Sequence, residues 1–487
     1  MYRKKKISRL KELYKNISLP VKASFWYLFC SILQKAIGFL TTPIFTRVMS
    51  TDDFGTVSMY NSWESIFTVL CTLYLYNGVY NNAMIECRDD RDGFTSAMQS
   101  LTTLLTVVVF SIYFIFSKQL IGIIGLPNKI MALMMVDIVF TAGMSFWSIR
   151  NRYEYKYKSV ALFTILSTLL MPVISLTLVL NASKEKAFAR IVGTVIVHTC
   201  VYLVVYVLNL RRGRKVYEKN YWKYGISFNL PLIPHYLSST ILTQSDRVVI
   251  NNICGRSYAA IYSIASNVTS IMNIVTVSIN QALTPWIFEK LERKEMKTIG
   301  ATTYKIMSFV GVGFVLTSFI TPEFVAILAP LEYKQAIWAT PPLLVSTFLY
   351  FIYCNFGNIE IYFHKQKAML FSSIVVAVFN LILDYFLVRE YGFIAASYAT
   401  MISYFLYTTL HYLFMSRVCK EKNEENPYNL KTNVLIIFAF AALILAPSLL
   451  YRTTLLRYAI FFLTTLLFGF VILRNRALLK EIFIRKK

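Results

Sequence analysis

Apolar residues along the chain gather into long runs, and short polar stretches separate one run from the next. Each run has about twenty residues, the length that a helix needs to cross a hydrocarbon core of about 30 Å. The pattern therefore predicts an all-α polytopic membrane protein with about fourteen transmembrane helices. The predicted spans are 24–46, 56–78, 96–117, 129–149, 159–180, 188–210, 226–248, 258–284, 303–327, 338–361, 368–388, 393–416, 432–451 and 458–473.

Charged residues make up only 15% of the chain, and their placement orients the predicted spans. With the N-terminus inside the cell, the cytoplasmic stretches hold 36 Lys and Arg residues and the external loops hold 9. Because cytoplasmic loops of membrane proteins are enriched in these residues, both termini are predicted to be cytoplasmic. The net charge of +25 then follows from topology, and no nucleic-acid partner is expected.

An internal repeat divides the predicted spans into lobes. Thr46–Met49 closes the first span and Asp246–Val249 closes the seventh, and a short turn follows each. Since the two spans have the same orientation, a parallel repeat about an axis along the membrane normal is expected. We therefore expect two pseudo-symmetric six-helix lobes followed by two C-terminal helices. The expected parts are a basic cytoplasmic tail (1–23), an N-lobe (24–210), a basic cytoplasmic linker (211–225), a C-lobe (226–416), a second cytoplasmic linker (417–431), two further spans (432–473) and a basic cytoplasmic tail (474–487).

Several ionisable and amide side chains lie inside the apolar runs. A charged group at the middle of a bilayer costs about 2.5–3.5 kcal/mol, so such groups are expected to face a water-filled cavity or another helix. The predicted substrate-binding cations of a central cavity are Lys35, Arg47, Arg247 and His235. Its predicted polar lining is Gln34, Asn61, Glu64, Asn267 and Asn273. Interhelical hydrogen bonding is the alternative for the polar stripes, and Asp246 could pair locally with Arg247.

Three carboxylates within predicted spans are candidates for ion coupling, although each could equally pair with a buried Lys or Arg. They are Asp137, Glu360 and Asp384. His198 and His235 could bind protons, and the alternative for each is a structural histidine with satisfied hydrogen bonds. Arg190 could reach the external interface with its long side chain. The chain has no GxxxxGK[ST], HExxH or GxSxG motif, and its seven cysteines form no CxxC pair. No metal, cofactor, catalytic residue or enzymatic activity is therefore expected.

Two stretches near the eleventh and twelfth predicted spans carry a recognisable pattern. Asn380–Leu387 is followed by Tyr391–Thr400, which resembles the "N-x-x-L-x-x-x-L … y-G-i-x-G-A-A-x-A-T" signature of polysaccharide-biosynthesis transporters. Ala395 and Ser397 stand where that signature favours Gly and Ala. Pro43–Arg47, followed by Asp53-Phe54-Gly55, is similar to the same family. The chain thus resembles the Wzx-type O-antigen flippases of the multidrug/oligosaccharidyl-lipid/polysaccharide exporter superfamily.

This resemblance implies a two-lobed V shape, like that of multidrug exporters of the superfamily, and alternating access. It also implies a substrate, undecaprenyl-pyrophosphate-linked oligosaccharide, that moves from the cytoplasmic to the outer leaflet of a bacterial cell membrane during O-antigen, capsule or exopolysaccharide synthesis. Membrane lipid and other polysaccharide-assembly membrane proteins are the remaining expected partners. A cationic cavity suits such cargo, because a pyrophosphate needs Lys or Arg to offset its charge.

Two other functions compete with this expectation. A cation-coupled multidrug exporter of the same superfamily would be expected to have twelve spans and an acidic cavity, whereas fourteen spans and a basic cavity are predicted here. An oligosaccharide polymerase or ligase would need a large external loop with arginines, and the predicted external loops are short. The sequence leaves the glycan, the coupling ion and the oligomeric state open.

Overall fold

The computed structural model of the chain describes residues 18–474, and within this range every regular element is helical. The predicted tails therefore lie outside the described residues, apart from the positions next to the first and last helices. The chain divides into two compact units, Met1–Leu237 and Ser238–Lys487. The division falls inside a helix that the sequence analysis gave to the C-lobe.

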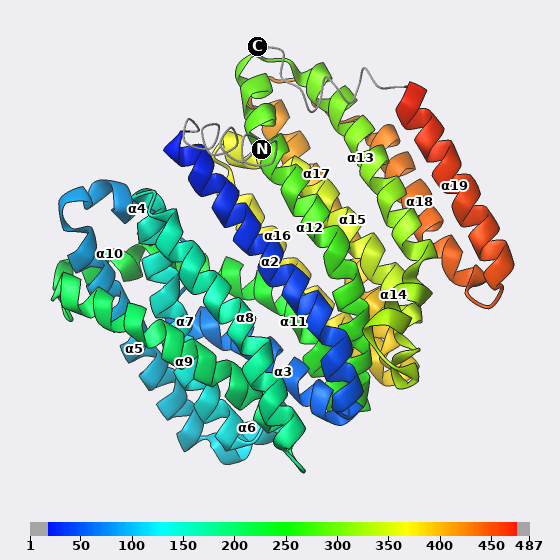
Figure 1. The fold of residues 1–487 in the computed structure, drawn as a ribbon. Coiled ribbons are helices and arrows are strands. Elements are labelled where there is room, and N and C mark those ends of the chain that lie inside the picture. Colours follow the sequence, from blue (N-terminus) through cyan, green and yellow to red (C-terminus); the bar gives the residue numbers. More distant parts are fainter. Residues whose placement is uncertain (1–17, 475–487) are drawn as a thin grey trace, which may run out of the picture. The chain divides into compact units, whose positions relative to one another are not determined.

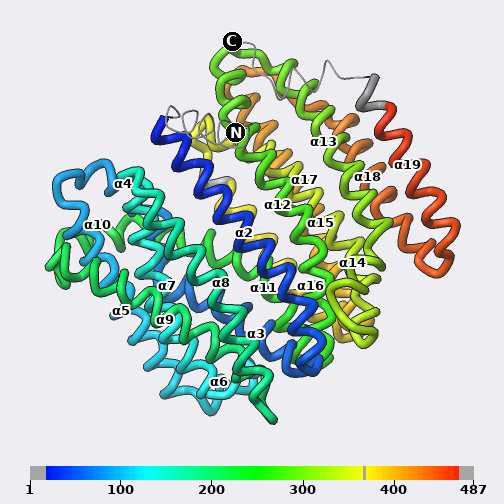
Figure 2. Tube along the Cα trace, in the orientation of Figure 1, coloured from blue at the N-terminus to red at the C-terminus, as the bar shows by residue number. Residues whose placement is uncertain are grey.

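Unit 1 is built from long helices, among which α8 with α9 and α7 with α9 pack most extensively. Figure 1 labels these helices, and Figure 2 traces the chain through them. The α-helices of unit 1 are α2 (Leu19–Val48), α3 (Thr51–Thr72), α4 (Val79–Glu86), α5 (Arg91–Ile115), α6 (Ser117–Ile124), α7 (Asn128–Tyr153), α8 (Tyr157–Asn181), α9 (Lys186–Gly213) and α10 (Lys219–Asn229), and α11 (Ile233–Cys254) begins there.

Unit 2 is organised around one central helix, α15 (Ala336–Tyr362), which packs against six other α-helices and most extensively against α17 and α12. The remaining α-helices of unit 2 are α12 (Arg256–Glu292), α13 (Met296–Phe319), α14 (Thr321–Leu328), α16 (Gln366–Tyr391), α17 (Ile394–Glu421), α18 (Leu430–Leu445) and α19 (Thr454–Arg474). The last two helices both pack against α13 (Figure 1).

Each predicted span coincides with one or two of these helices. By length and composition alone, ten helices among the described residues could cross a membrane. Three further spans lie on α3, α11 and α17, whose polar side chains lower their hydropathy, and a fourth on α19, whose apolar part, Thr454–Phe470, is shorter. The protein is therefore an all-α, multi-pass membrane protein.

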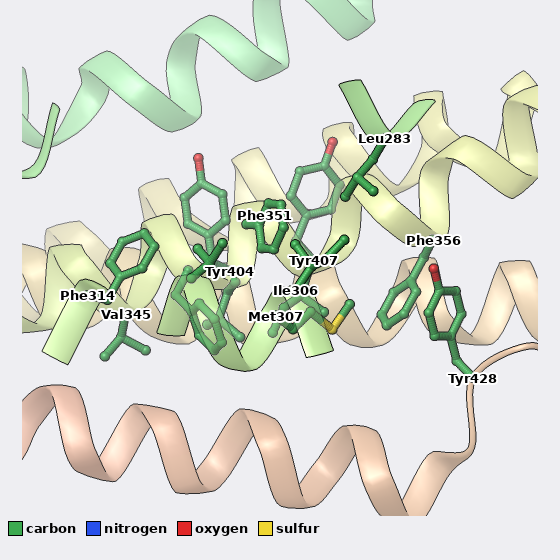
Figure 3. Close-up of a cluster of buried hydrophobic side chains, with 14 of the residues drawn as sticks. Leu283, Ile306, Met307, Phe314, Val345, Phe351, Phe356, Tyr404, Tyr407 and Tyr428 are labelled. Atoms are coloured by element: carbon green, nitrogen blue, oxygen red, sulfur yellow. The ribbon is translucent and has the colours of Figure 1, made fainter. Parts of the chain in front are cut away.

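Aromatic and long aliphatic side chains fill the core of unit 2. Phe314, Phe351 and Phe356 come from α13 and α15, and Figure 3 shows them beside Tyr404 and Tyr407 of α17. The three phenylalanines are completely buried. This packing fixes α15 and α17 against each other, and these two helices position several of the buried polar groups described below.

The predicted cytoplasmic linker 211–225 contains part of α10 and packs against α5. Trp222 donates an indole hydrogen bond to the Ala97 carbonyl at 3.0 Å, and both Lys215 and Tyr221 reach an Asp90 carboxylate oxygen at 2.7 Å. Partial burial acts to raise the pKa of Asp90, but the hydrogen bonds from Lys215 and Tyr221 outweigh it and hold that pKa below its usual value. The segment is thus a docked element of unit 1.

Candidate functional site

The predicted cations of the first span lie on exposed parts of α2. Lys35 and Arg47 are both exposed, and Arg47 donates a hydrogen bond to the Pro43 carbonyl at 2.8 Å. Within the described chain, no hydrogen bond or ion pair holds the Lys35 ammonium group. Since α2 has the length and hydropathy of a membrane span, an exposed ammonium group near its middle is expected to face water rather than hydrocarbon.

The predicted cations of the seventh span fall into different units. His235 belongs to unit 1, and its ring centroid lies 5.9 Å from that of Tyr236. Arg247 belongs to unit 2, where it donates to Ser263 Oγ on α12 and to Gln244 Oε1, both at 3.1 Å. Its neighbour Asp246 has other partners, so the local ion pair weighed from sequence does not form. Convergence of these cations on one cavity stays a prediction.

The asparagines of the predicted polar lining differ from the Ser and Thr residues beside them. Asn61 on α3 and Asn273 on α12 are exposed, and Asn267 is half-buried. Within residues 18–474 the side chains of these asparagines make no hydrogen bond, whereas neighbouring Ser and Thr hydroxyls bond back to carbonyls of their own helix. Such back-bonding is a local structural contact. The amides are therefore the better candidates for contacting a polar substrate.

A buried acid–histidine pair joins α7 to α9 in unit 1. Asp137 is 1% exposed, and its two carboxylate oxygens contact Tyr60 OH at 2.8 Å and His198 Nδ1 at 2.7 Å. Glu64, one helical turn after Tyr60 on α3, lies close enough to interact with Asp137 electrostatically. Asp137 pairs with a histidine and not with the Lys or Arg that was the alternative, and a coupling role for Asp137 stays a prediction.

His198 also lines a polar pocket of about 220 Å³ inside unit 1, between α2, α8 and α9. Gln34 of the predicted polar lining and Arg190 also line this pocket. The guanidinium lies 4.0 Å from the centroid of the Phe45 ring. Pro172 on α8 lacks an N–H, so the Thr168 carbonyl one turn earlier loses its helical donor, and both residues line the pocket.

Two carboxylates meet in the interior of unit 2. Asp246 on α11 and Asp384 on α16 are 4% and 0% exposed, and they lie close enough to interact electrostatically. Asp246 Oδ2 accepts hydrogen bonds from Tyr262 OH and from Thr400 Oγ1, the latter at 2.9 Å. Asp246 Oδ1 and both carboxylate oxygens of Asp384 are buried without a hydrogen-bond donor in the described structure.

Asn380, one turn before Asp384, completes this group. It is fully buried, and its side-chain oxygen accepts from Ser245 Oγ at 3.3 Å while its amide nitrogen has no partner. Buried carboxylates without donors are costly unless a proton or a cation offsets them. The carboxylate, amide and hydroxyl oxygens gathered here are the ligands that hard cations prefer. This group is therefore the strongest candidate cation site in unit 2.

Glu360, the third candidate carboxylate, has a different environment. Its Oε1 lies 2.9 Å from His411 Nδ1, and both side chains are completely buried. Tyr353 stacks on the His411 ring with centroids 5.0 Å apart. The pair thus lies fully inside unit 2, with no exposed side-chain surface. Its contacts are those of a structural pair, and a coupling role for Glu360 stays a prediction.

The sequence analysis missed the group formed by Asp246, Tyr262 and Thr400. A signal was present, because Asn380, Asp384 and Thr400 all stand within the two stretches that carry the family-like pattern. Those stretches lie on α16 and α17, which pack against each other. The polar residues Asn380, Asp384 and Thr400 inside these two apolar helices were therefore the signal that pointed to this site.

Comparison with known proteins relates both units to membrane transporters. The profile of a family described as "Polysaccharide biosynthesis protein" matches residues 21–291. A Haemophilus influenzae protein of the Lsg locus is 21% identical over 364 residues, which are 73% of this chain and 88% of that protein.

Two solved structures resemble the fold over most of the chain. The lipid II flippase MurJ, in an inward closed conformation, has a TM-score of 0.68 at 14% identity and covers 94% of this chain and 100% of its own. An inward-facing multidrug resistance MATE family transporter of the MOP superfamily has a TM-score of 0.65 at 14% identity, covering 80% of this chain and 96% of its own. These likenesses establish the fold as that of the MOP superfamily transporters.

Proposed function

Because the chain belongs to the polysaccharide biosynthesis protein family, we propose that it is a flippase rather than an enzyme. Its proposed substrate is a polyprenyl-pyrophosphate-linked oligosaccharide, with undecaprenol as the lipid. It would move this repeat unit from the cytoplasmic to the outer leaflet of a bacterial cell membrane by alternating access. O-antigen, capsule or exopolysaccharide synthesis would use the product.

The observation that carries this proposal is the exposed Lys35 ammonium group on α2. An ammonium group that faces water inside a membrane span favours an anionic substrate. A pyrophosphate is anionic and is bound well by Lys and Arg. Arg47 on the same helix and Arg247 on α11 would add positive charge. The exposed amides of Asn61 and Asn273 would contact the sugars.

The proposed membrane orientation has both termini in the cytoplasm. With a negative cell interior, outward movement of a dianion is favoured by about 2.3 kcal/mol per charge for each 100 mV of potential crossed. The potential therefore drives the loaded step in the proposed direction. Membrane lipid would hold the polyprenyl tail, and other polysaccharide-assembly proteins would receive the repeat unit.

A coupled cation is the second part of the proposal. Asp246, Asp384 and Asn380 would bind a monovalent cation such as sodium, because their oxygens are buried and poorly supplied with donors. Its binding would offset the repulsion between the two carboxylates. A cation-coupled multidrug exporter of the superfamily would share such a site, so the substrate, and not the ion, distinguishes the two functions.

The substrate proposal is tested with purified protein in vesicles that contain a fluorescent polyprenyl-pyrophosphate-linked oligosaccharide. We expect Lys35→Ala and Arg47→Ala to slow flipping about tenfold or more, since a hydrogen bond to a charged group contributes about 1.5–3 kcal/mol. Lys35→Arg keeps the charge and is the matched control, with a much smaller loss. In cells the same alanine variants should lose surface polysaccharide while inserting normally.

Flipping at the wild-type rate in both alanine variants would rule out the cationic cavity. Transport of a cationic drug, with no flipping of the lipid-linked saccharide, would favour the multidrug exporter instead.

A further inference from the structure

The pocket of unit 1 offers hydrogen-bonding groups and positive charge but no carboxylate. Arg190 and His198 are its ionisable cationic residues, and none of its lining residues is acidic. Hydroxyls of Ser167, Thr168 and Thr194 contribute to its walls. A chamber of about 220 Å³ with polar walls has ample room for several water molecules. The His198 ring therefore has access to water from the pocket side.

The opposite side of the His198 ring contacts a buried acid. Its Nδ1 lies 2.7 Å from Asp137 Oδ1, while Tyr60 OH donates to Asp137 Oδ2 at 2.8 Å. A neutral histidine that donates through Nδ1–H keeps an acceptor lone pair on Nε2. Because Nδ1 is engaged by Asp137, Nε2 is the ring nitrogen available to the pocket. A proton can therefore bind at Nε2 without breaking the bond to Asp137.

The charged and titratable neighbours of this pair are few. From α3 they are Tyr60 and Glu64. From α9 they are Tyr202, stacked on the His198 ring with centroids 5.1 Å apart, and Arg190, which lines the same pocket. The pocket residues of α2 and α8 have no titratable side chain. The histidine thus has one carboxylate in contact, a second carboxylate close to the first, and an arginine in the same pocket.

We propose that His198 and Asp137 form a proton-binding site of unit 1 that communicates with water through the pocket. One proton converts a neutral imidazole beside a carboxylate into an imidazolium–carboxylate pair. The net charge of the pair rises from −1 to 0, and the pocket wall gains a cation beside Arg190. The site binds a proton, is separate from the carboxylates of unit 2, and does not depend on the identity of the transported substrate.

The Glu360–His411 pair provides a natural control within the same chain. It has the same pairing of a carboxylate with Nδ1, but both of its side chains are 0% exposed, whereas the His198 side chain is 18% exposed. The second ring nitrogen, His411 Nε2, is buried without a partner. A proton would have to enter a dry, low-dielectric interior to reach it, which is unfavourable.

The direct test is ¹⁵N-histidine NMR of the full-length protein in lipid nanodiscs between pH 5 and pH 8.5. The chain has four histidines, so single substitutions assign every signal. We expect the Nε2 signal of His198 to change with pH, and Asp137→Asn to displace or abolish that transition. The His411 signals should stay constant over the same range. A constant His198 signal, or a transition indifferent to Asp137→Asn, would overturn the proposal.

A functional test separates this site from the proposed flippase activity. We expect His198→Asn, which retains a donor toward Asp137, to flatten the pH profile of flipping of the fluorescent lipid-linked saccharide. His411→Asn should leave the shape of that profile unchanged. An unchanged profile in His198→Asn would contradict the proton site even if flipping is normal. Absence of flipping in the wild-type protein would refute the proposed function, and the NMR result would still decide the proton site.

Discussion

Both units bury an aspartate that accepts a hydrogen bond from a tyrosine hydroxyl, but the second partner of each aspartate is different. In unit 1 Tyr60 donates to Asp137, whose other oxygen contacts His198. In unit 2 Tyr262 donates to Asp246, which interacts with Asp384. One carboxylate thus meets a base, and the other meets a second acid.

This difference changes what each unit can bind. An acid paired with a histidine is already supplied with a donor, and it needs at most one proton to become neutral. Two adjacent carboxylates repel each other, so they favour a proton or a metal cation that lies between them. A buried aspartate that accepts a hydrogen bond from a tyrosine therefore suits proton binding in unit 1 and metal-cation binding in unit 2.

The largest expected effect comes from removing the second acid of unit 2. Asp384→Asn removes one of the two negative charges, so we expect flipping to fall about a hundredfold and its dependence on sodium to disappear. Sodium at a hundred times its Kd should stabilise the wild-type protein by about 2.7 kcal/mol and so raise its melting temperature. In Asp384→Asn this sodium-dependent rise should be absent. The matched control, Asp137→Asn in unit 1, should keep the sodium-dependent rise in melting temperature. Full sodium stabilisation of Asp384→Asn would remove the cation site from unit 2.

The second prediction concerns an acid–histidine pair that is closed to water. His411→Ala leaves the Glu360 carboxylate buried without its partner, which costs about 3 kcal/mol for a buried pair. We expect a large drop in the melting temperature measured in detergent. Glu360→Gln keeps a hydrogen-bonding group and removes the charge, so the double variant should recover most of the loss. If the double variant melts as low as His411→Ala, cavity formation rather than an unpaired charge is responsible.

Hydropathy and charge predicted most of the fold, because the length of an apolar run and the placement of Lys and Arg are dictated by the bilayer itself. The interruptions were not predicted. The span 96–117 runs from α5 into α6, and 303–327 runs from α13 into α14. A hydropathy window averages over such breaks. The docking of residues 211–225 was also missed, since a stretch rich in Lys and Tyr is equally typical of an exposed linker.

The candidate site was predicted only in part, and the reason is geometric. Asp384 was found because a carboxylate inside an apolar run is unusual. Asp246 was considered as a partner of Arg247, but adjacent residues of a helix point in directions about 100° apart and do not face each other. Its real neighbours lie on α12, α16 and α17. Such contacts depend on the packing of helices distant in sequence, which periodicity does not reveal.

The third prediction compares the two tyrosines directly. Tyr262→Phe and Tyr60→Phe each remove one hydrogen bond, and bonds between membrane helices contribute about 0.6 kcal/mol on average and up to about 1.7. We expect similar small losses of melting temperature but different functional effects. Tyr262→Phe should change the sodium concentration at half-maximal flipping, and Tyr60→Phe should change the pH profile. The same functional change in both variants would show that the two aspartates do not have separate roles.

The smallest effect is expected outside the spans, at the ion pair between Lys215 and Asp90 of unit 1. Unlike the buried aspartates compared above, this pair is exposed to solvent. Lys215 and Tyr221 hold the pKa of Asp90 below its usual value, against the partial burial that acts to raise it. A lowered folded-state pKa stabilises the protein above the pKa of the unfolded chain, and this stability is lost as the pH falls through the folded-state value. Asp90→Asn should therefore lower the melting temperature by about 1–2 °C at pH 7, with less difference at pH 3 to 4. Exposed pairs are screened, so 1 M salt should shrink the effect at pH 7, whereas the loss in His411→Ala should persist. A salt-independent loss in Asp90→Asn would instead attribute it to the hydrogen bond that Asp90 accepts from the Gly93 N–H at the start of α5.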